Sequence, residues 1–290
     1  MIASEGVNEQ YSLPDMSVPD ADGASGNAQS MYDFRLKVYT LGRFTIINDG
    51  QPVSYGRKSP GKPLQLLKAL IANGARQISV SSLASVMWPD KDGDLALRSF
   101  EITLHRLRKH LGDDRYLTMD DGCLTLNSEL VWVDVWECER LMTKLRGLLS
   151  HHTDSDAVVN INACANRILR IYQGHFLSRE ETTSWSVSLE ERLRHRFIHT
   201  MLELGRFWEK QGVSAKAIEY YQRGIEVDDL VETFYQRLIV CLDHVGRQAE
   251  AIACYDQCRR VLSISMGLEP TDETQQIYRY MISSRQKKAG

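Results

Sequence analysis

The residues with the clearest chemical potential lie between Leu97 and Leu111, where cations and apolar side chains recur at helical spacing. The apolar positions form one stripe of an α-helix: Leu97, Phe100, Leu104, Leu107 and Leu111. The cations fall on the other side, with Arg106 at its margin: Arg98, His105, Arg106, Arg108 and Lys109. Arginine and lysine can read guanine in the major groove or hold phosphates, so this helix is a candidate reader of DNA. A solvated charged face is the competing interpretation of any short basic run.

The elements around this helix decide between those interpretations. A β-hairpin is predicted directly after it, because strand-like residues 116–119 and 123–126 flank an Asp-Gly turn at 120–122. Shorter elements are predicted before it, namely strands over 36–41, 44–47 and 53–55 and helices over 62–72 and from Ser81 or Ser82 to Trp88. A helix that starts at 92–94 and follows these elements has the position of the recognition helix in a winged-helix DNA reader.

The remainder of the chain is predicted to be helical. The periodicity favours helices over 137–149, 155–173, 186–211, 214–227, 231–245, 248–265 and within 271–290. The expected fold is mostly α, with an α+β winged helix followed by an all-α, tetratricopeptide-like helical-repeat domain. We expect an acidic leader over 1–34, a DNA-binding domain over 35–135, a helical-repeat domain over 136–282 and a frayed basic tail over 283–290.

The helical part contains an internal repeat with an offset of 34 residues, which is the tetratricopeptide period. The first unit carries Gly212, Ala215, Ala217, Ile218 and Tyr221, and these recur as Gly246, Ala249, Ala251, Ile252 and Tyr255. The small residues are expected where helices cross, and the helices over 137–173 and 186–211 are expected to complete the stack. Such a stack is a scaffold with a concave face for partners and carries no chemistry of its own.

Composition narrows the class of protein. No apolar run has the length of a membrane span, and the N-terminus has neither a basic nor an apolar segment, so we expect no signal peptide and a cytoplasmic protein. Six scattered cysteines lack a zinc-ligand spacing and are expected to be reduced and packed. Residues 1–30 hold five acids and no Lys or Arg, which predicts disorder. The rest holds 35 basic and 33 acidic side chains, so charge alone does not identify a nucleic-acid binder.

The segment from Gly56 to Lys62 matches the phosphate-loop pattern up to its last position. That position is Pro63, where a Ser or Thr should hold magnesium, and Pro60 removes an amide that would bind phosphate. We therefore expect a connector to the first helix rather than an ATP site. Its cations, Arg57, Lys58 and Lys62, are then candidate contacts for DNA phosphates.

Other residue patterns give only weak evidence for a metal site or a catalytic site. His195 and His199 have a spacing that can bind zinc, but no third ligand is evident and arginines surround them, which favours a solvated helix face. No Ser-His-Asp or paired-carboxylate arrangement stands out. We expect no metal, no cofactor and no enzymatic activity.

Several segments resemble the N-terminal domain of SARP-type (antibiotic-regulatory-protein) activators, which has an OmpR/PhoB-type winged helix. They are Leu41–Phe44, Gly56–Pro60, Met87–Asp90 and Leu104–Gly112, with Val131–Asp134 at the junction. Later segments resemble the bacterial transcriptional activator domain that follows it in this family. They are Tyr172–Leu177, Trp185 with Glu190–Leu193, and Tyr255–Leu262 with Gly267–Pro270. The resemblance covers about residues 35–280.

The resemblance implies a transcriptional activator that binds promoter repeats in double-stranded DNA. It further implies a helical domain that forms a homodimer or engages RNA polymerase. It assigns DNA contacts within the recognition helix to Arg98, Ser99, Thr103, His105, Arg106 and Arg108. With the cations already named, the expected DNA-binding residues are Arg57, Lys58, Lys62, Arg98, Ser99, Thr103, His105, Arg106, Arg108 and Lys109.

The hairpin departs from the family pattern. OmpR-like wings carry an Arg or Lys for the minor groove, whereas this tip is Asp120-Asp121, which phosphates would repel. Thr118 or Thr125 is then the remaining candidate in the wing for a contact with DNA. The acidic wing and the near-neutral charge favour an alternative, a helical-repeat adaptor whose degenerate winged helix binds protein. The cationic helix and the family motifs favour the DNA-binding activator.

Overall fold

The computed structural model describes residues 34–53, 61–150, 155–180 and 182–289. Residues 1–33 of the expected acidic leader, the connector with Arg57 and Lys58, and residues 151–154 lie outside the described residues. We call residues 34–133 the N-terminal region and residues 134–289 the helical region.

A small sheet opens the N-terminal region. It contains β1 (Leu36–Tyr39), β2 (Thr45–Asn48), β3 (Gln51–Pro52) and β7 (Val131–Val133) in the order β3-β2-β1-β7. β1 pairs with β2 in antiparallel and with β7 in parallel register. The third strand was expected at 53–55 but lies at 51–52. The reason is the turn: Asp49 and Gly50 both have positive φ, so a two-residue turn pairs Asn48 directly with Gln51.

The rest of this region is a winged helix. Its helices are α1 (Gly61–Ala72), α2 (Val80–Met87) and α3 (Gly93–Leu111), and its second sheet has the order β4 (Ile78–Ser79), β6 (Cys123–Leu126), β5 (Leu117–Asp120). The hairpin predicted around the Asp-Gly turn is confirmed. The N-cap of α2 is Ser79 rather than Ser81 or Ser82, and its side chain accepts a hydrogen bond from the amide of Ser82 at 3.4 Å. The helix starts earlier because Ser79 already ends a strand.

α3 buries the predicted apolar stripe with one exception. Phe100, Leu107 and Leu111 are fully buried, and Leu104 is 3% exposed. Leu97 was assigned to this stripe but is 37% exposed. It lies toward the edge of a stripe centred on Phe100 and Leu107, and Ala96 takes the buried position in that turn.

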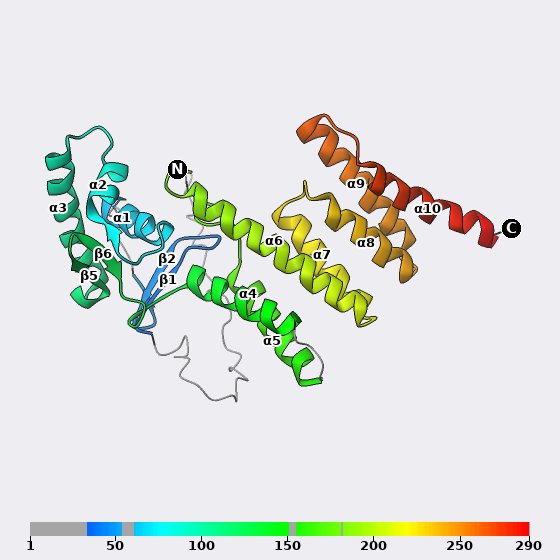
Figure 1. Ribbon diagram of the computed structural model, residues 1–290, viewed down its shortest axis with the longest axis horizontal. Coiled ribbons are helices and arrows are strands. Elements are labelled where there is room, and N and C mark those ends of the chain that lie inside the picture. The colour runs from blue at the N-terminus through cyan, green and yellow to red at the C-terminus, as the bar shows by residue number, and fades with distance from the viewer. Residues whose placement is uncertain (1–33, 54–60, 151–154, 181, 290) are drawn as a thin grey trace, which may run out of the picture. The chain divides into compact units, whose positions relative to one another are not determined.

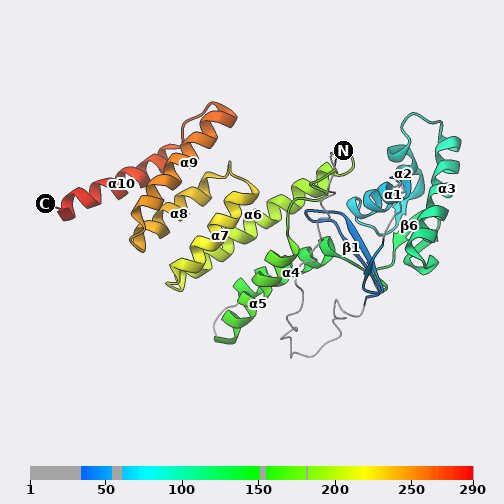
Figure 2. The ribbon, with the colours of Figure 1, turned by 180° about the vertical axis from the view of Figure 1, so that it is seen from behind.

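The helical region contains α4 (Asp134–Ser150), α5 (Ser155–Ile171), α6 (Val187–Lys210), α7 (Ser214–Val227), α8 (Glu232–His244), α9 (Gln248–Met266) and α10 (Asp272–Ala289). From α6 to α9 each helix packs beside the next (Figures 1 and 2). The fold is therefore mostly α, with a winged helix and a tetratricopeptide-like stack. α10 continues to Ala289, where fraying was expected from residue 283.

The repeat is visible in the stack, where Ala217 and Ala251 are fully buried, as expected for small residues between packed helices. Gly212 and Gly246 adopt left-handed conformations after α6 and α8, with φ of 72° and 76°. Ala215 and Ala249 of the repeat are exposed. The tightest described crossing is at Gly224, where an added Cβ would lie 2.1 Å from the ring of Phe234.

Five of the six cysteines are packed, as expected. All six cysteines are free thiols, and all but the half-buried Cys123 are buried. Burial raises the pKa of the Cys254 and Cys258 thiols to about 12, as expected for packing residues. Among the described residues, no helix is long and apolar enough to cross a membrane.

Asp134 fastens the start of α4 to the end of β1. Its buried carboxylate accepts hydrogen bonds from the Thr40 amide at 2.5 Å, the Thr40 hydroxyl at 2.7 Å, the Leu41 amide at 2.7 Å and the Val135 amide at 2.8 Å. Burial raises the pKa of Asp134 to about 6, although these hydrogen bonds act in the opposite direction. One carboxylate therefore joins the two regions.

A second set of contacts joins the loop after β1 to the segment after α5. Leu41 forms a β-bridge with Phe176, and the Gly42 amide donates to the carbonyl of His175 at 2.9 Å. Gly42 has a φ of 89°, and an added Cβ would lie 3.0 Å from the backbone of Gln173. Glycine is needed here because the two backbones approach so closely.

A buried lysine also connects the N-terminal region to the helical region. Lys68 on α1 is 7% exposed, and its ammonium lies 2.5 Å from a carboxylate oxygen of Glu180. The same ammonium lies 4.1 Å from the centre of the Phe44 ring. A buried ammonium requires such a partner, so the winged helix depends on a residue of the helical region.

Candidate nucleic-acid interface

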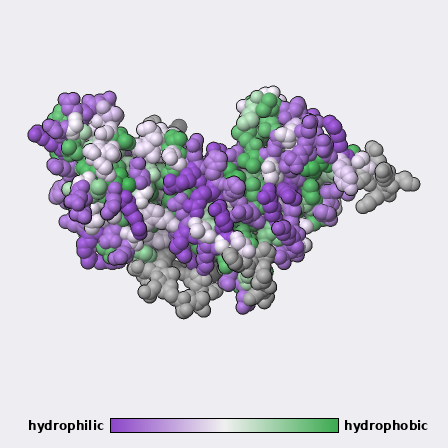
Figure 3. Space-filling view, in the orientation of Figure 1, coloured by the Kyte–Doolittle hydropathy of each residue, from purple (hydrophilic) through white to green (hydrophobic). Residues whose placement is uncertain are grey.

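The outer face of α3 presents a row of cations. Arg98, His105, Arg106 and Lys109 are all exposed, because they lie opposite the buried stripe. Ile102 lies among them and is 56% exposed. Figure 3 shows hydrophilic and hydrophobic residues side by side at this end of the molecule. Leu95, about two helical turns earlier, is 52% exposed, so the face combines hydrogen-bond donors with two exposed apolar side chains.

Thr103 and Arg108 are placed differently from the other predicted contacts. Thr103 is 6% exposed, and its hydroxyl donates to the carbonyl of Ser99 at 2.7 Å. Arg108 is half-buried, and its guanidinium donates to the carbonyl of Leu117 in β5 at 2.8 Å. Thr103 is thus turned into the core, and Arg108 ties the helix to the wing.

Ser99 is half-buried near the start of α3. Its hydroxyl donates to the carbonyl of Leu95 at 2.8 Å and accepts a hydrogen bond from the ammonium of Lys91 at 2.8 Å. Lys91 precedes the helix, so this bond connects the α2–α3 turn to the predicted DNA-contacting face.

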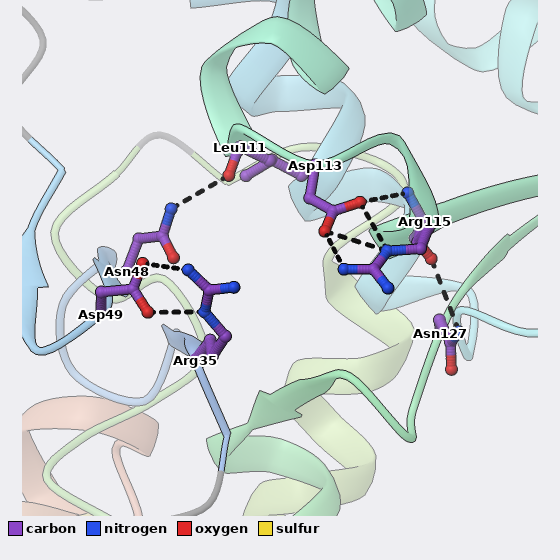
Figure 4. Close-up of polar contacts among 7 residues, drawn as sticks. All are labelled: Arg35, Asn48, Asp49, Leu111, Asp113, Arg115 and Asn127. Carbon is purple, nitrogen blue, oxygen red and sulfur yellow. Dashed lines mark hydrogen bonds and ion pairs between the residues drawn. The ribbon is translucent and has the colours of Figure 1, made fainter.

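The C-terminal end of α3 is held by the turn after β2 (Figure 4). The side-chain amide of Asn48 donates to the carbonyl of Leu111 at 3.2 Å. This bond satisfies one of the carbonyls that a helix end leaves open. Beside it, hydrogen bonds from Arg115 hold the pKa of Asp113 at about 2, and Arg35 pairs with Asp49 at 2.7 Å. The small sheet thus fixes the register of the recognition helix.

Lys62 does not lie on the outer face of α3. Its ammonium donates to the carbonyl of Met87 at 3.2 Å and lies 5.8 Å from the centre of the Trp88 ring. It lines a hollow beside the α2–α3 turn. Among the described residues, Lys62 thus lies with the α2–α3 turn and not among the predicted contacts on the outer face of α3.

The wing has an acidic, exposed tip. Asp121 and Gly122 have positive φ, and this turn leaves Asp120 and Asp121 exposed. Thr118 is exposed on β5, whereas the half-buried Thr125 accepts a hydrogen bond from the Gln77 amide at 2.9 Å. Of the two threonines expected to serve the wing, Thr118 is the accessible one.

The sequence interpretation missed Ile102. Its signal was a β-branched apolar residue in the middle of the cationic side, a position that the apolar stripe of a packed helix does not need. An exposed apolar side chain at this place suits contact with a thymine methyl group.

The structure places no third metal ligand beside the two histidines that have a zinc-binding spacing, within the described residues. His195 and His199 are exposed on α6, and the neighbouring Arg196 is paired with Glu139 at 3.0 Å. No three His, Cys, Asp or Glu side chains form a group that could hold a metal ion within the part of the chain that the structure describes.

Comparison with known proteins identifies the helical region. The family described as bacterial transcriptional activator domain matches residues 133–281. The regulatory protein AfsR of Streptomyces griseus is 26% identical over 263 residues, which cover 85% of this chain and 25% of AfsR. The transcriptional regulator RedD of Streptomyces coelicolor is 25% identical over 259 residues, which cover 84% of this chain and 72% of RedD. The chain thus spans about a quarter of the length of AfsR.

A solved structure supports the same architecture. The structure described as Mycobacterium tuberculosis EmbR in complex with low affinity phosphopeptide aligns with a TM-score of 0.63. The alignment has 17% sequence identity and covers 86% of this chain and 65% of the EmbR chain. EmbR combines a winged helix with a tetratricopeptide-like region, as this chain does. The chain belongs to the bacterial transcriptional activator domain family, and its two regions have the organisation of SARP-type regulators.

Proposed function

We propose that the chain activates transcription by binding repeats in promoter DNA through α3. The observation that carries this proposal is the exposed cationic face of α3, which is anchored by a buried stripe on one side and by Asn48 at its end. Residues 35–135 would read DNA. Residues 136–282 would form a homodimer or engage RNA polymerase. The proposed place of action is the cytoplasm, on the nucleoid.

The residues have different proposed roles. Base contacts are assigned to Arg98, His105 and Arg106, which are exposed on α3, and phosphate contacts to Ser99 and Lys109. Arg57 and Lys58 are proposed phosphate contacts beside α1. Thr103 and Arg108 are left out of the contact set, because Thr103 is buried and Arg108 bonds to the wing. Lys62 is left out because it lines the hollow beside the α2–α3 turn.

Footprinting of genomic DNA with the full chain tests the proposal. We expect protected repeats upstream of a limited set of genes and an affinity that falls steeply with salt, because phosphate contacts release counterions. Run-off transcription from such a promoter with purified RNA polymerase should then depend on the protein. Uniform, weak binding to all DNA would contradict the proposal.

The acidic wing is the observation that favours a second function, a protein-binding adaptor. Asp120 and Asp121 are exposed and would be repelled by a duplex. An adaptor would show no protected DNA in the footprinting experiment and would still bind a protein partner.

Replacement of Asp120 should reveal how the wing meets the duplex. Asp120→Arg exchanges a repelled charge for an attracted one, so it should tighten non-specific DNA binding and steepen the salt slope by about one. Titration at several salt concentrations measures both. Asp256→Arg makes the same charge change on the exposed side of α9 and serves as the control. Equal effects of the two variants would mean that the tip does not face DNA.

Ile102 should recognise a thymine methyl group. Replacement of one thymine in the site by uracil removes that methyl group and should weaken binding by about fourfold. The Ile102→Ala variant should be insensitive to the same replacement, because it no longer makes the contact. Val159→Ala removes a comparably exposed apolar side chain on α5 and should leave the sensitivity intact. A uracil effect that is the same size in Ile102→Ala and in the parent would contradict the assignment.

A further inference from the structure

The winged helix and the helical region together line a hollow that the DNA-binding proposal does not use. It has a volume of about 510 Å³ and lies between α1, the α2–α3 turn and the segment before α6. This volume is within the ordinary range of small-molecule sites, about 300–1,000 Å³. The lining residues that matter to the argument are Lys62, Trp88, Asp90, Lys91 and Trp185.

The walls of the hollow combine aromatic surface with positive charge. Trp88 directly follows α2 and is 9% exposed, and the half-buried Trp185 comes from the segment before α6. The ammonium of Lys62 lies 5.8 Å from the centre of the Trp88 ring. Such walls suit a planar ring, since indole rings stack on other aromatic rings.

The two lysines are available to an anion. Their hydrogen bonds in the described part of the chain are with uncharged oxygens, the Met87 carbonyl for Lys62 and the Ser99 hydroxyl for Lys91. Neither lysine forms an ion pair with a carboxylate among the described residues, and Asp90 is the one acidic residue in the described lining. If a ligand carboxylate bound here, the two lysines would replace hydrogen bonds to uncharged oxygens with stronger hydrogen bonds to a charged one.

We propose that this hollow binds a small aromatic molecule that carries a negative charge. The ring lies against Trp185 and Trp88, and the anionic group accepts hydrogen bonds from Lys62 and Lys91. The size of the hollow and the pairing of two indoles with two ammonium groups favour this ligand over a protein segment.

Such a ligand would act on the recognition helix. Lys91 is bonded to Ser99, and Ser99 lies on α3 beside the exposed cationic face. A bound anion that draws Lys91 away releases the Ser99 hydroxyl and neutralises a cation next to the DNA. Ligand binding should therefore weaken DNA binding. This effect rests on the proposed function, whereas the ligand site itself does not.

Titration of the full chain with 2-naphthoate tests the site. The chain has five tryptophans, so the indole N–H signals in a nitrogen-15 NMR spectrum can be assigned with single Trp→Phe variants. We expect the signals of Trp88 and Trp185 to shift with a dissociation constant on the order of 1 mM, as suits a ligand of this size. The other indoles should not move. The uncharged 2-naphthylmethanol should bind about tenfold more weakly.

Variants locate the contacts. The double variant Lys62→Gln with Lys91→Gln should bind the acid and the alcohol equally, and Trp185→Ala should lose binding of both. Tyr280→Ala removes a ring on α10 that is 76% exposed and outside the hollow, so it should bind naphthoate like the parent. Equal shifts of all indoles, no preference for the acid, or no saturation would overturn the proposal. So would shifts of the Trp185 signal on addition of RNA polymerase without any response to naphthoate, because the hollow would then dock protein.

The DNA-binding effect is measured separately. Saturating naphthoate should weaken specific DNA binding severalfold in the parent and not in Lys91→Gln. If the indoles shift but the DNA affinity of the parent stays constant, the ligand site stands and the regulatory effect is wrong. If no specific DNA site is found at all, the proposed function fails while the indole shifts still decide the ligand site.

Discussion

Arg106→Ala should weaken specific DNA binding by about 1–3 kcal/mol, which is about 5- to 150-fold in affinity. Arg106 is exposed on the outer face of α3 and no ion pair holds it among the described residues, so its guanidinium is available to a base. The measurement is fluorescence anisotropy on a footprinted site at several salt concentrations. If Arg106 holds a phosphate instead, the salt slope should fall by about one, with similar losses on all sequences.

The controls for Arg106 follow from the geometry. Arg259→Ala removes an exposed arginine from α9 and should leave the affinity unchanged. Arg108→Ala is a less direct test, because it also removes the hydrogen bond to Leu117 and should lower stability as well as affinity. Affinity of Arg106→Ala equal to that of the parent at every salt concentration would contradict the assignment of α3 as the DNA reader.

Asp134→Ala should lower the free energy of unfolding by about 3 kcal/mol. The substitution leaves the buried amides of Thr40 and Leu41 without their acceptor, and each such loss costs about 1–3 kcal/mol. Relief of the buried carboxylate's desolvation offsets part of that cost. Urea unfolding followed by circular dichroism measures the change.

Two further variants separate the role of Asp134 from the general loss of a carboxylate. Asp256→Ala removes an exposed acid from α9 and should change stability by less than about 0.5 kcal/mol. Thr40→Val removes one of the donors to Asp134 and should cost about 1 kcal/mol. Asp134→Ala as stable as Asp256→Ala would mean that this carboxylate does not hold the two regions together.

The contacts between the N-terminal and helical regions decide which fragment can be used to study the winged helix alone. A fragment of residues 31–136 contains every element of the winged helix. It would lack Glu180, the partner of the buried Lys68, and Phe176, which bridges to Leu41. A fragment that extends beyond Glu180 keeps both contacts and is the better test of independent DNA recognition.

The sequence by itself predicted the helices, the hairpin and their order, but not the short strands β4 and β7 or the position of β3. Local signals are strong here: the stripe of α3 repeats at helical spacing, the Asp-Gly pair at 121–122 fixes a two-residue turn, and the 34-residue offset marks the repeated helical pairs. These signals depend on residues a few positions apart, or on direct repetition, so one sequence contains all the information they need. The cationic face of α3 followed from the same periodicity.

The tertiary structure decided which of those residues are free to act. Thr103 and Arg108 share the helix with Arg106, yet one is buried and the other bonds to the wing. Whether these two side chains are exposed depends on contacts with β5 and with the core. The periodicity of α3 alone does not predict those contacts.

The contacts between distant segments were also beyond the sequence. Asp134 binds the backbone of Thr40, and Lys68 pairs with Glu180, more than 90 residues away in each case. Trp88 and Trp185 come together in one hollow. Such pairs leave no periodic pattern, because each depends on how whole elements pack, and packing is decided by burial and hydrogen-bond satisfaction across the entire fold.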